Sequence, residues 1–400
     1  MLSDLKVSLF LAYKSITKGN KGTLILTIFI LSLVFVNLMF IASIFLGLTD
    51  TMGNQVIDTL YGNIVIEPKK DEKYINDVYS LEQKIRSIPG IEGVLAQYIT
   101  GATLSYKDKS GSWSVRSVNP DDAMTVTITH NFMIDGEYLS KLDTSEIILG
   151  KEIPGGYGGD QEQLSLGGVR VGDSIDVLFN NGVKKSYRVK GVFDVTFTQA
   201  NNIAYISQRE MESVFGLEDK ASQILIKTKD RGNEDRYVKQ LSELGIKENI
   251  KPWTAYAASI KNITRSFDMI SVLISAIGLF VASVTIFIII YVSTISKRRQ
   301  IGILRAVGIK ESVVIYSYIF QAMFIAICGT IIGFFIMFFV LRPWFIGHPL
   351  KFPIGFVSLL ILPENILINA ISLIAVALTA GFVPSWIAVR QTIMDAMWGD

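Results

Sequence analysis

The sequence predicts a membrane α-helical protein: four transmembrane helices, with a large mixed α+β extracytoplasmic domain inserted between spans one and two. Three observations support this fold class. Half of the residues are hydrophobic, four long runs carry no charged residue, and nearly all acidic residues lie between the first two runs. A charged fraction of 18% is too high for a chain embedded throughout its length, so a sizeable water-facing part is expected.

The four uncharged runs are long enough to cross a bilayer. They extend over Gly22–Thr49, Met269–Ser296, Ser312–Leu341 and Asn365–Val389. Each exceeds the roughly 20 apolar residues that a helix needs to cross the hydrocarbon core. We therefore predict transmembrane helices at 22–49, 265–296, 312–341 and 365–389. A cleaved signal peptide at the N-terminus is the alternative, but the first run is too long and no small-residue cleavage site follows it.

Basic residues beside the spans predict the orientation. The segment 1–21 carries four lysines against one aspartate, and the loop 297–311 carries five basic residues against one glutamate. The loop 342–364 is apolar and nearly uncharged. Because Lys and Arg in short loops are retained in the cytoplasm, both termini, including the tail 390–400, are predicted to be cytoplasmic. Residues 50–264 and the short loop 342–364 are then extracytoplasmic, and the chain is a multi-pass protein of the cell (inner) membrane.

The segments that flank the first two spans have helical patterns of their own. Residues 2–17 place apolar side chains and lysines on different faces, which predicts an amphipathic helix at the cytoplasmic interface within the segment 1–21. Residues 51–60 are expected to continue the first span as a stalk, and residues 255–267 to run into the second span as another. Two such stalks are suited to passing motion from the membrane to the inserted domain.

The inserted domain alternates helical and strand patterns. Apolar residues spaced by three and four predict helices at 74–88, 208–215 and 236–244. Short runs rich in β-branched and aromatic residues, separated by Gly, Pro and Asn turns, predict strands. These runs are YGNIVIEP, IEGVLAQYI, ATLSYKD, SWSVRSV, EIILGKEI, SIDVLFN, KSYRVKGVFDV, NIAYIS and SQILIKT. We expect two lobes, with boundaries near residues 125–145 and again after 215.

Several kinds of chemistry are missing from the sequence. The glycine cluster PGGYGGD lacks the lysine of a P-loop, so ATP binding by that device is excluded. The only histidines, His130 and His348, are far apart, and the single cysteine, Cys328, lies inside a span. No GxSxG elbow occurs. We therefore predict no catalytic residue, no cofactor and no metal site; the net charge of +2 is uninformative about nucleic acid, which is not an expected partner.

The four uncharged runs themselves contain no carboxylate, histidine or arginine. Ion-coupled transporters usually place such a group inside the bilayer, so a self-sufficient secondary transporter is not expected. The main polar exceptions, Asn37 and Gln321, are more simply explained by hydrogen bonds between helices. Energy for any transport must come from a partner.

The basic segment from Lys297 to Ser312 carries the clearest functional pattern. On a helix, Arg298, Gly302 and Arg305 share one face, and Ile301, Leu304 and Gly308 share a neighbouring one. Gly308 suits a left-handed C-terminal cap. Such an amphipathic helix can press its apolar ridge into a groove on a cytoplasmic partner. The alternative is that the arginines only enforce topology and bind anionic head groups of membrane lipid.

The segment KRRQIGILRAVG resembles the loop between the second and third spans of FtsX-like, MacB-type permeases of ABC transporters, where a pattern close to RxxEIGxxxAxG is typical. Gln300 replaces the usual glutamate. The phrases IPGIEGV, EIILGKEI, LGGVRVGDSIDV and YRVKGVFDV resemble the extracytoplasmic domain of this family, and LAYKSITKGNKGTLILT its interfacial helix. The ending VPSWIAVRQTIMDAM is a partial match, because a customary proline is absent at Ile393 to Met394.

The resemblance implies a permease subunit with the four-span architecture of LolC and LolE. Such a subunit pairs with a second permease, identical or related, and the pair binds two copies of a cytoplasmic ABC ATPase. The ATPase-coupling residues implied by the match are Arg298, Arg299, Gln300, Ile301, Gly302, Arg305, Ala306 and Gly308. Charge reversal at Arg298 and Arg305 is then expected to release the ATPase. In the third span, Gly329 and Gly333 form a small-xxx-small pattern for close helix packing.

Two functions stay open at this point. In the first, the chain is a permease that couples ATP hydrolysis on a partner to motion of the extracytoplasmic domain, for export or for release of lipoproteins or amphiphiles. In the second, it is an FtsX-like regulatory protein that recruits and gates an extracytoplasmic protein such as a cell-wall hydrolase. The size of the inserted domain favours the first. A membrane-tethered enzyme is a third option, without a recognisable catalytic cluster to support it.

Overall fold

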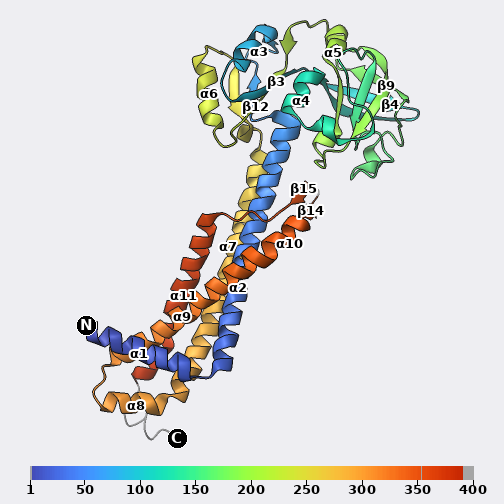
Figure 1. Ribbon diagram of the computed structural model, residues 1–400. Helices are drawn as coiled ribbons and strands as arrows, with labels where there is room; N and C mark the ends of the chain where they lie inside the picture. Colours follow the sequence, from blue (N-terminus) through green and yellow to red (C-terminus); the bar gives the residue numbers. More distant parts are fainter. Residues whose placement is uncertain (1, 353, 391–400) are drawn as a thin grey trace. The chain divides into compact units, whose positions relative to one another are not determined.

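The computed structural model describes residues 2–352 and 354–390. The predicted tail, with Ile393 and Met394, lies outside these residues except for Arg390. The chain divides into two units (Figure 1). The membrane unit comprises Met1–Thr49, Ile263–Leu350 and Val357–Asp400, and the α/β unit comprises Asp50–Asn262 and Lys351–Phe356.

Helices of very different lengths build the membrane unit. They are α1 (Leu2–Lys18), α2 (Lys21–Val56), α7 (Ala258–Ser296), α8 (Arg298–Ala306), α9 (Glu311–Ile336), α10 (Arg342–Gly347) and α11 (Pro363–Val389). Among the described residues, four helical segments are long and apolar enough to cross a membrane: Lys21–Tyr61, Asn262–Ser296, Glu311–Gly347 and Pro363–Ile387. The inserted α/β unit lies between the first and second of them, which confirms the predicted fold class.

The third helical segment extends beyond the predicted end at Leu341. A π-helical turn, η6 (Met337–Leu341), joins α9 to α10 without a break, so the helix continues to Gly347. Pro343 is the second residue of α10, directly after the π-helical turn, and does not end the helix. The rest of the loop forms a small hairpin of β14 (Leu350–Phe352) and β15 (Gly355–Val357).

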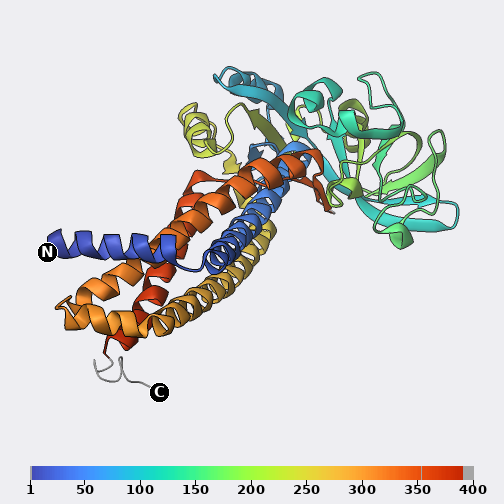
Figure 2. The same ribbon diagram turned by 60° about the horizontal axis from the view of Figure 1, so that its bottom comes forward.

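Glycines allow α9 to pack closely on two other helices. A Cβ atom at Gly329 would lie 2.8 Å from Leu31 Cβ of α2, and one at Gly333 would lie 2.8 Å from the Ser32 carbonyl oxygen. A Cβ at Gly381 of α11 would lie 2.7 Å from Ala322 Cβ of α9. Helix α9 is therefore the central element of the bundle, which Figure 2 shows from another direction.

The α/β unit contains a four-stranded antiparallel sheet. Its strand order is β13 (Asn249–Pro252), β1 (Ile64–Glu67), β12 (Gln223–Thr228) and β3 (Ile91–Gln97). Its core is built from the alternate strand residues Ile64, Ile66, Ile224 and Ile226 with residues of α3 (Val78–Arg86) and α6 (Glu234–Glu243). A third helix, α4 (Pro120–Val126), shares a second core with Val65, Leu95 and Leu225. The sheet is thus covered on both faces.

A seven-stranded mixed sheet forms the rest of this unit. Its order is β6 (Met133–Gly136), β9 (Lys184–Phe193), β7 (Glu146–Gly150), β10 (Ile203–Ser207), β5 (Lys109–Val118), β4 (Ile99–Tyr106) and β8 (Ser174–Phe179). Strand β8 also pairs with β9, so the sheet closes on itself from β9 to β8. Helix α5 (Gln208–Phe215) follows β10, and a minor pair is formed by β2 (Ile75–Asn76) and β11 (Lys220–Ala221). Short 3-10 turns are η2 (Thr129–Phe132), η3 (Glu162–Leu164), η4 (Ala200–Asn202) and η5 (Trp253–Ala255).

The lobe boundaries differ from the prediction. The chain first passes from the small sheet to the large one at Tyr98, between β3 and β4. The chain returns to the small sheet with α4 and passes to the large sheet again before β6. The expected lobe boundary at 125–145 therefore corresponds to this second passage between the sheets. The first was missed because no turn residue separates the two strands. The boundary after 215 agrees with the structure, where β11 and β12 return to the small sheet.

The predicted helix at 74–88 is shorter in the structure. Residues Ile75 and Asn76 form β2, and Asp77 adopts a left-handed conformation with φ of 53°. A helix cannot pass through that conformation, so α3 begins at Val78. The two expected stalks are parts of α2 and α7: α2 continues through a π-helical turn, η1 (Ile57–Tyr61), and ends at Gly62, where φ is +64°.

Candidate coupling site

Helix α8 is anchored to the membrane unit by its apolar residues. Ile301 is 6% exposed and belongs to the same core cluster as Tyr318 and Ala322 of α9. Gly302 is buried beside it, and Leu304 is half-buried. The ridge of Ile301 and Leu304 that was expected to face a partner therefore faces inward. Helix α8 has apolar residues on two sides, so the sequence alone does not show which side is buried. Packing against the rest of the membrane unit selects the side of Ile301.

The C-terminus of α8 is closed by a Schellman motif. The N–H of Ile309 donates to the carbonyl of Leu304 at 3.1 Å, and the N–H of Gly308 donates to the carbonyl of Arg305 at 3.0 Å. Gly308 has φ of +96°, the left-handed conformation that the sequence predicts. The motif turns the chain sharply into α9 and fixes the direction of α8.

Arg305 connects three helices. Its Nη1 donates to the carbonyl oxygen of Val389, at the end of α11, at 2.9 Å. Its Nη2 pairs with Glu311 Oε1, in the first turn of α9, at 2.5 Å. A cation next to the last carbonyls of a helix is favourable for its dipole. Only 16% of the Arg305 side chain is exposed, and its contacts connect α8 to α9 and α11.

The outward surface of α8 consists of Arg299, Ile303, Ala306 and Val307. These residues are spaced by four, three and one along the helix, so they share one side. Ile303 is 49% exposed and Val307 80% exposed. We call this set the outer face of α8. The spacing of these four residues is visible in the sequence. It was not recognised there because Ile301 and Leu304 suggested a different apolar side.

The remaining predicted residues of the segment lie at the flanks. Arg298 is half-buried, and Gln300 is exposed and lines a groove shared with α1. Beside it, Lys297 Nζ donates to Ser15 Oγ at 2.5 Å, and Ser15 Oγ donates to Gln321 Oε1 at 3.1 Å. This chain connects α1 to α9 and supports the interpretation of Gln321 as a helix-to-helix contact.

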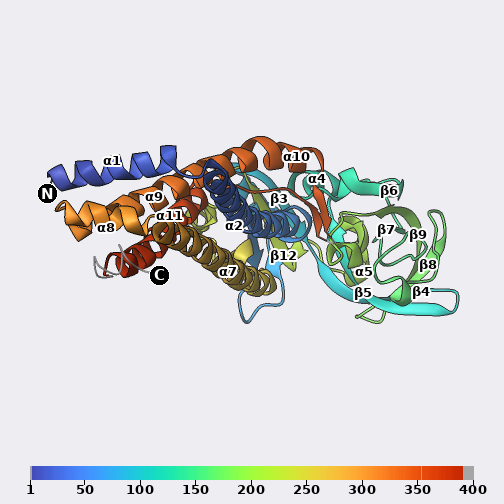
Figure 3. The same cartoon turned by 90° about the horizontal axis from the view of Figure 1, so that it is seen from below.

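A second contact fixes α1 to the turn after α8. Lys310 Nζ donates to Asp4 Oδ2 at 3.0 Å. The hydrogen bond with Lys310 lowers the pKa of the Asp4 carboxyl. Figure 3 shows α1 beside α9 near α8. Any force on α8 is thus shared by α1, α9 and α11.

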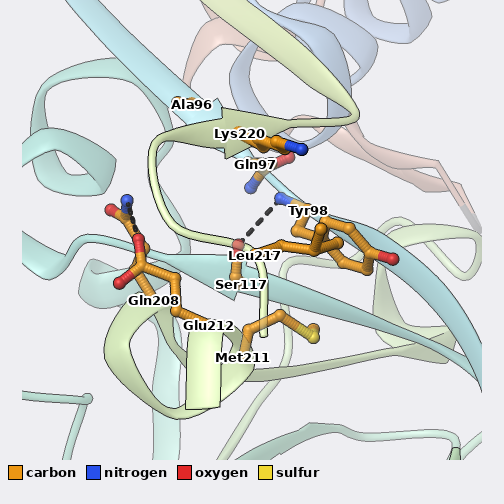
Figure 4. Close-up of a pocket in the computed structure, with 9 residues that line it drawn as sticks. All are labelled: Ala96, Gln97, Tyr98, Ser117, Gln208, Met211, Glu212, Leu217 and Lys220. Atoms are coloured by element: carbon orange, nitrogen blue, oxygen red, sulfur yellow. Dashed lines mark hydrogen bonds between the residues drawn. The ribbon is translucent and has the colours of Figure 1, made fainter. Parts of the chain in front are cut away.

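The α/β unit offers little room for a small ligand between α5 and the sheets. Figure 4 shows the residues that line a pocket there. The volume of this pocket is about 10 Å³, enough for roughly one water molecule. Inside it the Tyr98 N–H donates to Ser117 Oγ at 2.8 Å, and Gln208 Nε2 donates to Glu212 Oε1 at 2.9 Å. Across residues 2–352 and 354–390, no group of three His, Cys, Asp or Glu side chains is arranged to hold a metal ion.

The stalk part of α2 is fixed to the small sheet by polar contacts. Arg231, which follows β12, pairs with Asp50 at 3.0 Å and contacts the Trp253 ring at 5.5 Å from its centroid. Lys227 of β12 pairs with Asp58. Tyr61 stacks on Tyr256 with ring centroids 4.7 Å apart. These contacts lie where α2 ends and shortly before α7 begins.

Comparisons with known proteins match the chain to one family model and to a permease. Residues 272–393 match the family model of the FtsX-like permease C-terminal domain. An uncharacterized ABC transporter permease of Methanocaldococcus jannaschii is 22% identical over 257 residues, which cover 62% of this chain and 61% of that protein. The chain therefore matches less than two thirds of the length of this relative.

Two solved structures align with about half of the chain. The extracellular domain of YknZ, a noncanonic ABC-type transporter from Gram-positive bacteria, aligns with a TM-score of 0.34 and 14% identity, over 48% of this chain and 97% of that one. The periplasmic region of MacB from Actinobacillus actinomycetemcomitans aligns with a TM-score of 0.37 and 15% identity, over 52% and 96%.

The fold defines a class of multi-pass membrane proteins that carry an α/β domain between the first and second of four spans. Residues 272–393, which include α8 and α9, match the model of the FtsX-like permease C-terminal domain, and the chain is similar to an ABC transporter permease.

Proposed function

We propose that this chain is the permease subunit of an ABC transporter, and that α8 is the helix through which a separate cytoplasmic ATPase drives it. The observation that carries the proposal is the outer face of α8: Arg299, Ile303, Ala306 and Val307 are exposed while the opposite side of the helix is buried. The face lies within the residues that match the FtsX-like permease model. Exposed apolar residues beside a cation are typical of protein interfaces.

The orientation belongs to the same proposal. The ATPase is cytoplasmic, so α1 and α8 lie on the cytoplasmic side and the α/β unit lies outside the cell membrane. The excess of lysine and arginine around these two helices supports this direction. The permease acts as a pair, identical or related, with one ATPase docked on each copy.

Motion of the α/β unit, and not a polar pore, is the proposed output. The four spans carry no charged residue in their central runs, which disfavours a pathway for polar solutes through the bundle. Export or release of a lipoprotein or amphiphile on the outer side is compatible with such a bundle. Gating of an extracytoplasmic protein is the alternative outcome.

The docking assignment is tested by changing the outer face of α8. We expect the double variant Arg299→Glu and Val307→Asp to lose a co-purifying ATPase, with binding weakened roughly a hundredfold or more, because a central apolar contact and a cation are both removed. The measurement is the ATPase recovered per permease after affinity purification of the full chain from native membranes.

Two further variants separate docking from folding. Lys6→Glu reverses an exposed charge on α1 and is expected to retain the ATPase. Arg305→Gln removes the contacts of Arg305 with Val389 and Glu311 and is expected to lower the unfolding temperature of the chain. The outer-face variant is expected to leave the unfolding temperature unchanged. Retention of the ATPase by the outer-face variant would contradict the proposal.

A further inference from the structure

A groove opens on the cytoplasmic side of the bundle in the proposed orientation. Its mouth, about 310 Å³ in volume, lies between α1, α8 and α9. A trough of about 500 Å³ continues from it along α2 and α7. The two cavities share Ser15, Gly19 and Lys297, so they are parts of one groove. Figures 1 and 3 show α1 near the end of the helix bundle beside α9.

The mouth is positively charged. Lys14, Lys18 and Lys297 line it, and in the described part of the chain none of the three pairs with a carboxylate. Lys297 is half-buried, and desolvation lowers the pKa of its ammonium group because no anion compensates the burial. Within residues 2–352 and 354–390, its Nζ has Ser15 Oγ as its hydrogen-bond partner. A negative ligand at this position would supply the missing counter-charge.

The trough is apolar and opens toward lipid. Ile288 and Val292 of α7 are 51% and 59% exposed, and Leu24 and Ile325 line the opposite side. These residues lie within predicted spans, where a soluble partner cannot reach. A ligand that fills the whole groove must therefore have an anionic head and a hydrocarbon tail.

We propose that this groove binds one anionic phospholipid, with its phosphate at Lys14, Lys18 and Lys297 and one acyl chain along α7. Basic pockets between transmembrane helices on the cytoplasmic side are suited to anionic head groups. The bound lipid joins α1 to α7 beside α8, so it stiffens the support of the proposed docking helix. The site itself does not depend on the docking proposal.

The test uses the full chain in phosphatidylcholine vesicles that contain a photoactivatable phosphatidylglycerol with the reactive group on an acyl chain. We expect adducts on the peptides that contain Ile288 and Val292 of α7. The variant Lys14→Gln with Lys297→Gln is expected to lose adducts by about fivefold for each lysine removed. Lys6→Gln removes a charge of the same helix outside the groove and is expected to leave the yield unchanged.

A second variant guards against misfolding. Val292→Trp blocks the exposed trough while every lysine remains, and we expect it to lower the α7 adducts. Equal labelling by a phosphatidylcholine probe, adducts spread evenly over the lipid-facing helices, or equal loss in Lys6→Gln would each overturn the proposal. Loss of labelling on adding excess inorganic phosphate would assign the mouth to a free anion, which also contradicts a lipid site.

Discussion

Glu82 of α3 is an acidic side chain whose ionisation is altered by its surroundings. Its Oε1 accepts the N–H of Ala96 at 3.1 Å. Burial, and then the nearby Asp122, raise the pKa of Glu82 from 4.5 to about 7. The folded chain therefore holds this proton more tightly than the unfolded chain does. The stabilisation is complete below about pH 4.5 and is lost as the pH rises through 7.

Replacing Glu82 tests the predicted direction of this pH dependence of stability. We expect Glu82→Gln to raise the free energy of unfolding by about 1 to 2 kcal/mol at alkaline pH, after allowance for solvent screening, and to change little near pH 4. Thermal unfolding of the full chain in detergent at several pH values measures it. Glu92→Gln, at an exposed position on β3, is the control. A stabilisation that is largest in acid would refute the assignment.

The basic residues around α8 act in different ways even though they are adjacent in sequence. Arg305 donates a hydrogen bond to Val389 and pairs with Glu311. Lys297 lines the groove beside α1, and Arg299 is exposed. The sequence identified the segment and the cap at Gly308, because both depend on local patterns. The sequence could not assign different roles to these three residues, because their roles depend on which side of α8 packs against the helix bundle.

At the level of elements, close packing of α9 on α2 depends on positions without a side chain. At Gly333, a Cβ would lie 2.8 Å from the Ser32 carbonyl oxygen and 2.9 Å from Phe35 Cδ1. Backbone cannot move away as a flexible side chain can. We expect Gly333→Ala to destabilise the membrane unit by about 1 to 3 kcal/mol, as overpacked cores do.

Gly278 of α7 is the matched control. A Cβ there would lie 3.3 Å from Leu38 Cδ2, the end of a flexible side chain. Alanine is the better helix former, so Gly278→Ala is expected to be neutral or slightly stabilising. The unfolding temperatures of both variants in detergent provide the comparison. Equal effects at the two glycines would show that the distance to backbone is not what matters.

Elements with strong periodicity were predictable, and those set by tertiary contacts were not. Helix α5 has the predicted bounds of 208–215, because Ser207 caps it and Gly216 ends it in a left-handed conformation. Helix α4 was missed because it has only seven residues. The crossing at Tyr98 was missed because pairing with different neighbours, and not a turn, separates β3 from β4.

For the whole molecule, the division into two units falls inside helices. The membrane unit ends at Thr49 within α2 and resumes at Ile263 within α7, with no loop at either position. An unbroken helix transmits displacement along its axis because each turn is hydrogen-bonded to the next. The contact of Arg231 with Asp50 fixes the first residue of the α/β unit to the small sheet. Under the proposed function, α2 is therefore a direct mechanical connection.

Interrupting that connection should separate ATP hydrolysis from its output. We expect insertion of Gly-Ser-Gly-Ser after Thr49 to preserve ATPase binding through α8, because the outer face is unchanged, and to abolish nucleotide-dependent changes in hydrogen exchange of β1, β12 and β13. The same insertion at Gly158, an open position with no atom near its Cβ, is the control and should retain those changes. If the inserted α2 still transmits the nucleotide response, motion must reach the α/β unit by α7 alone, and the role assigned to α2 is wrong.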